Sequence, residues 1–172
     1  MATIDFSGLF RTYAPDLHRF ALFLSGDPAL AEDLVSETFI RLWNARQRVD
    51  LSTVRGYLFT ITRNLYLHHR RRAARATDLD ERMADAAPDP ERRAQTRSEL
   101  GSVHAALQEL PEVDRAAVLL RAEGEMSYEE IAAALGLSAV AARVRVHRAR
   151  LKLAAARRLG GAIPQTQKEI QP

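Results

Sequence analysis

A cluster of arginines near the carboxyl end of the chain carries its most evident chemistry. No carboxylate follows Glu130 until Glu169, so the cluster has no acidic neighbours in the sequence. The basic side chains of the cluster are Arg143, Arg145, Arg148, Arg150 and Lys152. An arginine guanidinium can pair with the acceptor edge of guanine or with a phosphate oxygen. The cluster therefore indicates nucleic-acid binding.

Two predicted helices, joined by a tight turn, position these arginines. Ser127 is a favourable N-cap for the first helix, and Glu130 completes a capping box. Gly136 ends that helix, because glycine readily adopts the left-handed conformation of a helix C-terminus. Ser138 caps the second helix. Residues 127–153 therefore predict a helix-turn-helix.

The second of these helices has distinct faces. Apolar residues at positions i, i+4, i+7 and i+11 predict a core face of Ala142, Val146, Ala149 and Leu153. The flanks are basic, and the face opposite the core consists of Val140, Val144 and His147. A small apolar ridge between basic flanks suits a helix in the major groove, where valine can contact a thymine methyl group. The alternative is a solvated amphipathic helix whose arginines confer solubility.

Length and charge limit the classes of protein to which the chain can belong. The chain has 172 residues, enough for one ordinary domain or two small ones. The net charge is only +3, but basic residues gather in 41–75 and 143–158, with an acidic segment, 78–91, between them. Two separated basic segments suggest two contacts with a polyanion.

Other features disfavour several kinds of site and location. The absence of cysteine excludes disulfides, thiol chemistry and cysteine-based zinc sites. The first residues, MATIDFSGLF, lack the basic region and apolar run of a secretory signal. No apolar stretch approaches the ~20 residues that span a bilayer. We therefore expect a cytoplasmic protein without membrane insertion and without a cofactor.

Helical periodicity dominates the chain and strand alternation is nowhere sustained, so the expected fold class is all-α. Apolar residues recur at helical spacing over 5–25, where Pro15 predicts a kink or a break near Ala14. Asp27 is a good N-cap, and Pro28 a good first residue, for the helix that follows. That helix is expected to bury a wide stripe of Ala31, Leu34, Val35, Thr38, Phe39 and Leu42.

The opposite side of this second helix combines acidic, polar and apolar side chains. It consists of Asp33, Ser36, Glu37, Ile40 and Asn44. An isoleucine among acids can dock a basic partner helix. A solvated face with one exposed apolar residue is the more common case, and periodicity alone favours it.

A polar loop, 44–53, precedes a third helix, which Ser52 is expected to start. Its core face is Val54, Leu58, Ile61 and Leu65, and it ends in Arg70, Arg71 and Arg72. Aromatic side chains and arginines on its other sides suit stacked bases and phosphates, with core packing as the alternative for the aromatics. His68 and His69 point about 100° apart on a helix and cannot chelate one metal ion together, so no metal site is expected.

The remaining segments define a two-domain organisation. Residues 76–96 are mostly acidic with little periodicity, which predicts a flexible linker after a first domain, 1–75. The second domain, 97–159, holds a helix face of Val103, Ala106, Leu107 and Leu110 that Pro111 terminates, then a helix over 112–123 that Gly124 ends, then the helix-turn-helix. Residues 160–172 are expected to form a disordered tail. The expected architecture is two small helical domains joined by a flexible linker.

Three blocks of the sequence resemble, in order and spacing, the sigma-70 family of RNA polymerase sigma factors. The blocks are PALAEDLVSETFIRLW, VRGYLFTITRNLYLHHRRR, and ALQELPEVDRAAVLLRAEGEMSYEEIAAALGL followed by VRVHRARLKL. Only a linker separates the two domains, which points to the extracytoplasmic-function, or group IV, subclass. The resemblance covers residues 6–156, nearly the whole chain.

The resemblance implies a role for each segment and no catalytic activity for the chain. The first domain is similar to the region that binds the clamp helices of the polymerase β′ subunit and melts the −10 element. The loop 44–53 is similar to a specificity loop that captures a flipped base. The second domain is similar to the region that reads the −35 element and meets the flap of the β subunit. An anti-sigma factor, commonly one attached to the membrane, is the implied regulator.

The resemblance also implies functional residues. The outer stripe of the second helix becomes the polymerase-docking face, made of Asp33, Ser36, Glu37, Ile40 and Asn44. The implied −10 contacts are Arg55, Tyr57, Arg63, Asn64, His68, Arg71 and Arg72. The implied −35 contacts are Ser138, Val140, Arg143, Val144, Arg145, His147 and Arg148.

This chain departs from the family pattern at three places. His68 stands where the family often has an aspartate in N-L-x-x-D-x-x-R-R, and Ser36 stands where the docking helix often has a glutamine. Residues 141–145, AARVR, replace a Thr-Val-basic-Ser-Arg run, so two hydroxyls that can meet phosphate or bases are missing. Phosphate anchoring then depends more on the arginines and Ser138. These departures bear on the −35 sequence rather than on the fold.

Three other readings remain. A dimeric repressor or activator can use the same helix-turn-helix, but the first domain has its own arginine-rich helix and no sign of a ligand pocket. A decoy that mimics a sigma factor to bind its inhibitor has no need of two basic helices. An enzyme is the least favoured, because the sequence has no nucleophile–base constellation and no glycine-rich phosphate loop.

Overall fold

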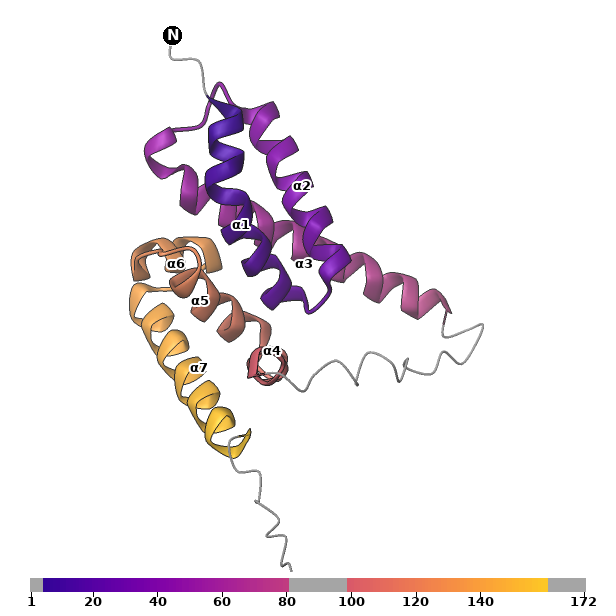
Figure 1. The fold of residues 1–172 in the computed structure, drawn as a ribbon, viewed down its shortest axis with the longest axis vertical. Coiled ribbons are helices and arrows are strands. Elements are labelled where there is room, and N and C mark those ends of the chain that lie inside the picture. The colour runs from indigo at the N-terminus through magenta and orange to yellow at the C-terminus, as the bar shows by residue number, and fades with distance from the viewer. Residues whose placement is uncertain (1–4, 81–98, 161–172) are drawn as a thin grey trace, which may run out of the picture.

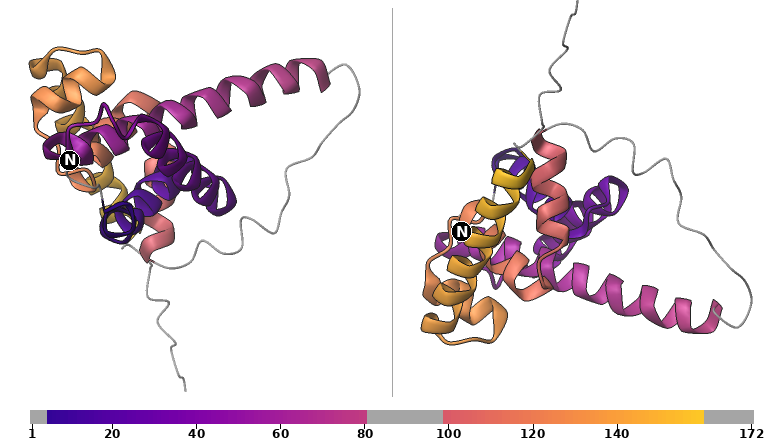
Figure 2. Two further views of the ribbon diagram at one scale, coloured as in Figure 1. Left: turned by 90° about the horizontal axis from the view of Figure 1, so that it is seen from above. Right: turned by 90° about the horizontal axis from the view of Figure 1, so that it is seen from below.

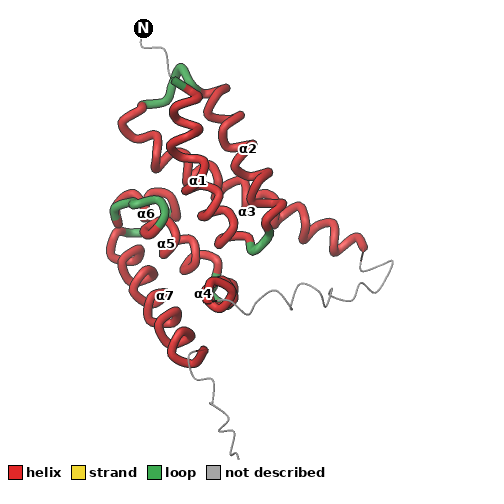
Figure 3. The backbone as a smooth tube through the Cα atoms, in the orientation of Figure 1, coloured by secondary structure: helices red, strands yellow, loops and turns green. Residues whose placement is uncertain are grey.

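The computed structural model describes residues 5–80 and 99–160, and these residues form seven α-helices and one short 3-10 helix. The elements are α1 (Phe6–Ser25), α2 (Pro28–Ala45), η1 (Leu51–Thr53), α3 (Val54–Asp80), α4 (Glu99–Gln108), α5 (Glu112–Ala122), α6 (Tyr128–Leu135) and α7 (Ala139–Gly160). None of the residues in these two ranges lies in a strand, and short loops join the helices (Figure 3). The predicted all-α fold class is confirmed.

The first half is a three-helix bundle, in which α1, α2 and α3 pack against one another (Figure 1). Asp27 caps α2 as predicted, because its Oδ1 accepts hydrogen bonds from the amides of Ala29 and Leu30. The buried residues of α2 are the predicted stripe of Ala31, Leu34, Val35, Thr38, Phe39 and Leu42. The opposite stripe of α2 therefore faces away from the bundle.

Helix α1 runs from Phe6 to Ser25 with Pro15 inside it, so of the predicted kink or break near Ala14 the break is wrong. A proline in a helix interior removes one N–H donor and costs about 3 kcal/mol. The turns that follow completely bury Leu17, Phe20, Ala21 and Leu24. Burial of a large apolar side chain stabilises by about 1.5–3 kcal/mol, so this face more than offsets the cost of the proline.

Helix α3 begins at Val54, directly after the 3-10 turn η1, and ends later than predicted. Asp50 caps η1, because its Oδ1 accepts a hydrogen bond from the Ser52 amide at 2.9 Å, and Ser52 lies within η1 just before α3. This hydrogen bond also lowers the pKa of the Asp50 carboxyl. At the other end, α3 continues to Asp80, inside the segment assigned to the linker, and its second half projects from the other helices (Figure 2). Residues 81–98 of the predicted linker and 161–172 of the predicted tail lie outside the described residues.

The second half consists of α4, α5, α6 and α7, and α7 packs against the other three helices. The predicted face of α4 is buried at Leu107 and Leu110 but wrong at Val103, which is 41 % exposed. Helix α5 ends at Ala122, and the left-handed residue of the following turn is Glu125, at φ 52°. Gly124 has a different role: a Cβ there would lie 2.6 Å from the Leu120 carbonyl oxygen, so the position has no room for a side chain.

The two halves are in contact, with α1 against α4 and α5. Gln108 Nε2 donates to the Phe23 carbonyl oxygen at 2.9 Å, and Arg115 Nη1 donates to the Leu24 carbonyl oxygen at 3.1 Å. Arg115 is buried there. Burial, together with the charge of Arg115, lowers the pKa of His104, whose ring meets Phe23 edge-on.

Candidate nucleic-acid interface

The turn before α7 forms as the sequence predicts. Ser127 Oγ accepts a hydrogen bond from the Glu130 amide at 3.1 Å, and a Glu130 carboxylate oxygen accepts one from the Ser127 amide at 2.7 Å. Gly136 adopts the left-handed conformation, at φ 66°. Ser138 Oγ accepts a hydrogen bond from the Ala141 amide at 3.1 Å and so caps α7. These local bonds fix the direction in which α7 leaves the turn.

Helix α7 presents the predicted outward face. Ala142, Val146 and Ala149 are fully buried against the second half. On the opposite side Val140 is 73 % exposed and Val144 is 40 % exposed. The other exposed residues of the predicted −35 set are Ser138, Arg143, His147 and Arg148. An apolar ridge with basic neighbours is thus open to solvent along α7.

Arg143 and Arg145 lie on opposite flanks of this ridge, and each contacts a residue outside α7. The Arg143 guanidinium carbon lies 5.0 Å from the centroid of the Tyr128 ring. Arg145 Nη1 donates to Asp114 Oδ1 at 2.9 Å. The Asp114 side chain is only 6 % exposed, whereas that of Arg145 is 38 % exposed. A buried carboxylate needs a charged or hydrogen-bonding partner, so Arg145 is tied to α5 in a way that sequence reasoning missed.

Five of the predicted −10 residues line the exposed surface of α3. They are Tyr57, Asn64, His68, Arg71 and Arg72. Two aromatic residues of the same helix, Phe59 and Tyr66, are buried and belong to the core. Tyr57 is therefore the aromatic side chain that α3 offers for base stacking among the residues that the structure describes.

Arg63 is nearly buried and is bound to the second half. Its Nε and Nη2 donate to the two carboxylate oxygens of Glu112 at 3.1 Å and 3.0 Å. The side chains are only 9 % and 13 % exposed. A paired arginine–carboxylate contact of this kind combines charge with fixed geometry.

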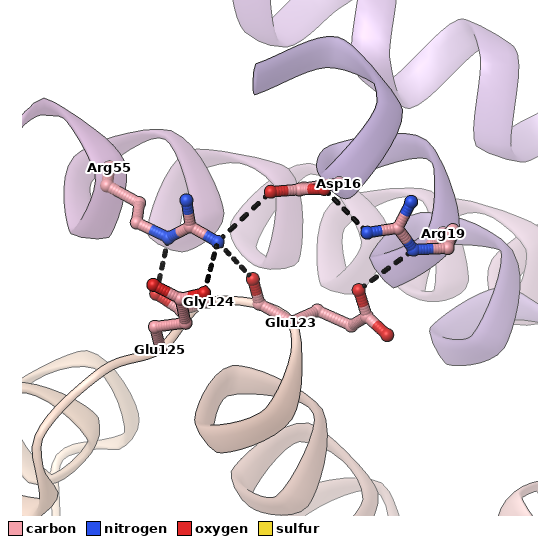
Figure 4. A network of polar contacts seen from close by, with 6 residues as sticks. All are labelled: Asp16, Arg19, Arg55, Glu123, Gly124 and Glu125. Carbon is pink, nitrogen blue, oxygen red and sulfur yellow. Dashed lines mark hydrogen bonds and ion pairs between the residues drawn. The ribbon is translucent and has the colours of Figure 1, made fainter. Parts of the chain in front are cut away.

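Arg55 is bound to the second half as well (Figure 4). Its Nε donates to the Gly124 carbonyl oxygen at 2.8 Å, and its Nη2 donates to the Glu123 carbonyl oxygen at 2.6 Å. Nη2 also reaches Asp16 Oδ2 at 3.1 Å. Arg19 Nε donates to Glu123 Oε2 at 3.0 Å in the same network, and that hydrogen bond raises the pKa of Arg19. Two predicted −10 arginines thus have intramolecular partners, which a sequence pattern cannot reveal.

The outer stripe of α2 is the predicted docking face. Asp33, Ser36 and Asn44 are exposed, and Ile40 is 54 % exposed. Glu37 is half-buried and pairs with Arg41 across one helical turn at 3.1 Å. Such a surface pair contributes little to stability, so the carboxylate can exchange partners.

An apolar groove of about 360 Å³ continues this stripe toward α1. It is lined by Phe6, Phe10, Ser36, Phe39, Ile40 and Trp43. Phe10 and Trp43 are nearly half exposed. These aromatic residues lie outside the docking face that was predicted from the sequence. The spacing of Trp43, three residues after Ile40 on α2, was the available signal.

In residues 5–80 and 99–160, no three His, Asp or Glu side chains gather in a way that could hold a metal ion. No helix in the same ranges is long and apolar enough to cross a membrane.

Family models match both halves. Residues 9–76 match the model of Sigma-70 region 2, and residues 100–153 match that of Sigma-70, region 4. The ECF RNA polymerase sigma factor EcfG of Rhodopseudomonas palustris is 37 % identical over 150 residues, which cover 86 % of this chain and 82 % of that protein. The chain belongs to the sigma-70 family, in the extracytoplasmic-function (ECF) subclass. This confirms the predicted resemblance.

A further relative and two solved structures of sigma factors are also similar to this chain. The ECF RNA polymerase sigma factor SigE of Mycolicibacterium smegmatis is 41 % identical over 152 residues, which cover 84 % of this chain and 58 % of that protein. The sigma factor RpoE of Bartonella quintana, solved with the anti-sigma factor NepR, is similar with a TM-score of 0.74 and 31 % identity. That match covers 91 % of this chain and 99 % of RpoE. CnrH, solved with the cytosolic domain of CnrY, is similar with a TM-score of 0.63, 31 % identity and coverage of 87 % and 85 % of the two chains.

Proposed function

We propose that this ECF family member is a promoter-specificity subunit that binds core RNA polymerase and directs it to promoters with paired −10 and −35 elements. One observation carries the proposal. A single chain exposes a basic-flanked apolar ridge on α7 and, on another helix, an apolar and acidic stripe on α2. A simple DNA-binding regulator needs the first surface but not the second.

In this proposal α2 docks on the clamp helices of the β′ subunit. Ile40 and the neighbouring aromatic groove supply apolar contact, and Asp33 and Glu37 supply charge for a basic partner helix. The second half meets the flap of the β subunit. The chain has no catalytic activity of its own and uses the active site of the polymerase.

The same proposal assigns promoter contacts to the two basic helices. α3 and the loop 44–53 hold the −10 strand, where trapping unstacked bases offsets a stacking cost of a few kcal/mol per step. α7 reads the −35 element in the major groove. The halves act as two domains, 1–75 and 97–159, joined by the linker 76–96. The proposal implies a cytoplasmic protein that associates with the nucleoid when active.

Promoter opening in this scheme requires the halves to separate. Arg55 and Arg63 cannot contact DNA while Glu123, Gly124 and Glu112 hold them. Binding to core polymerase supplies the contacts that replace this packing. The isolated chain, whose net charge is only +3, therefore binds promoter DNA weakly.

We also propose control by an anti-sigma factor. Support comes from two relatives of the same fold, RpoE and CnrH, which were solved in complex with NepR and with the cytosolic domain of CnrY. An inhibitor that stabilises the contact between the halves would keep Arg55 and Arg63 away from DNA.

Binding of the purified chain to core RNA polymerase is the first step of the proposed function, and it can be tested directly. Purified chain and core polymerase are mixed and separated by gel filtration. We expect a stoichiometric complex. A chain that elutes alone at micromolar concentrations would exclude the proposed function.

A further inference from the structure

Tyr128 contacts a guanidinium that faces the proposed DNA surface. Its ring is half-buried and packs against the hydrophobic core. Arg121 and Arg143 each place their guanidinium carbon 5.0 Å from the ring centroid. One aromatic side chain therefore links the end of α5, the start of α6 and the outward flank of α7.

Hydrogen bonds around Tyr128 restrict the position of its ring, against which Arg143 lies. Tyr128 is the first residue of α6 and lies within the capping box, between Ser127 and Glu130. Arg121 is fixed in turn, because its Nη1 donates to the Met126 carbonyl oxygen at 2.8 Å. The backbone and one of the two cations around the ring are thus held by hydrogen bonds within the second half.

The contact leaves Arg143 able to bind DNA. A guanidinium over an aromatic ring uses its face, and the N–H groups at its edge remain free to donate hydrogen bonds. Arg143 is exposed beside Val144 on the open side of α7. A guanine presents O6 and N7 as adjacent acceptors in the major groove, which match that edge.

Arg145, on the other flank, is held differently. It donates one of its edge N–H groups to Asp114. The charge of Asp114 also offsets the charge that Arg145 can offer to a phosphate. The two arginines are therefore not equivalent: within residues 5–80 and 99–160, Arg145 has a hydrogen-bonded carboxylate partner, whereas the contact shown for Arg143 is with the face of an aromatic ring.

We propose that Tyr128 is a positioning residue for sequence reading: it holds the Arg143 guanidinium at the flank of α7 so that its free edge meets a guanine of the −35 element. The inference rests on the proposed function. A long arginine side chain loses rotamer freedom when it binds a base, and a partner that already restricts it reduces this loss. Tyr128 thus increases the preference for guanine without touching DNA.

The test uses the full chain in complex with core polymerase. Run-off transcription from a promoter pool with a randomised −35 element gives the base preference at each position. The position read by Arg143 is the one whose guanine preference disappears in Arg143→Ala. Tyr128→Phe keeps the ring face and should retain the wild-type preference. Tyr128→Leu removes it and should reduce the guanine preference at that position about three-fold, as expected for one partly exposed cation–π contact.

A double-mutant comparison separates positioning from a structural effect. In the Arg143→Ala background, Tyr128→Leu should cause no further change of preference at any −35 position. Melting temperatures of all variants are measured in parallel. If Tyr128→Leu does not fold, Tyr128→Met can fill the same half-buried space without a ring face.

The outcomes distinguish this inference from the proposed function. A wild-type complex that selects −35 sequences while Tyr128→Leu keeps the full preference would overturn the inference alone. An equal change in the presence and absence of the Arg143 side chain would also overturn it. A wild-type chain that gives no promoter-selective transcription would remove the proposed function itself.

Discussion

Arg145 and Arg148 are the same residue type on the same helix, but their different surroundings give them different roles. Arg145 is bound to a buried carboxylate, whereas Arg148 is exposed on the open face of α7. Both belong to one basic cluster in the sequence. In the structure, Arg145 neutralises Asp114 and holds α7 against α5, while Arg148 is free to meet phosphate.

This difference predicts that two matched substitutions change the free energy of unfolding to different extents. Arg145→Ala leaves the Asp114 carboxylate buried without its partner and should reduce the free energy of unfolding by about 2 kcal/mol, a value lowered for the partial exposure of Arg145. Arg148→Ala should change it by less than about 0.5 kcal/mol. Urea unfolding of both variants provides the measurement.

A third variant tests the cause. Arg145→Ala combined with Asp114→Ala should recover part of the lost stability, because no unpaired charge then remains buried. Equal unfolding free energies for Arg145→Ala and Arg148→Ala would show that the pair has no structural role.

At the scale of helices, most of the stripe of α2 is exposed to solvent, so it should contribute little to the stability of the fold. Ile40→Glu should therefore leave the helical content and melting temperature unchanged, since the side chain is already half exposed. It should weaken binding to core polymerase at least about ten-fold, because a charge would then be buried in an apolar contact.

Val103→Glu is the matched control for this prediction. Val103 has similar exposure but lies on α4, away from the stripe. The control should bind core polymerase like the wild type. If the two variants bound equally well in a titration with labelled chain, the α2 stripe would not be the docking face.

The helices themselves were largely predictable, because their signals are local. Asp27, Ser127, Ser138 and Gly136 each act within a few residues of their own position, and each has its predicted role. One failure shows what local signals omit. Burial of the residues after Pro15 offsets the cost of the proline and keeps α1 continuous.

The candidate site was predictable to a smaller extent. Periodicity identified the open ridge of α7, because the core face of one helix defines its opposite face. The partners of Arg55 and Arg63 lie on another part of the chain, and no spacing within α3 contains them. The support that Tyr128 gives Arg143 was missed for the same reason.

At the scale of the whole molecule, the structure shows the halves joined by charged contacts that involve predicted DNA-binding residues. Glu112→Gln removes the charge opposite Arg63 and should favour separation of the halves. A charged hydrogen bond contributes about 1.5–3 kcal/mol, so we expect the isolated variant to bind single-stranded −10 DNA about ten-fold more tightly.

Glu109→Gln serves as the control. Glu109 is exposed, and its substitution changes the net charge by the same amount as Glu112→Gln. It should have little effect on DNA affinity in a fluorescence anisotropy titration. Equal affinities of the two variants would show that the Arg63–Glu112 pair does not restrict access to α3.

Run-off transcription from a genomic promoter pool, with purified chain and core polymerase, tests the central claim most directly. We predict transcripts that require the chain, start at a defined set of promoters, and disappear when either the −10 or the −35 element is scrambled. Transcription no different from that of core polymerase alone would contradict the account.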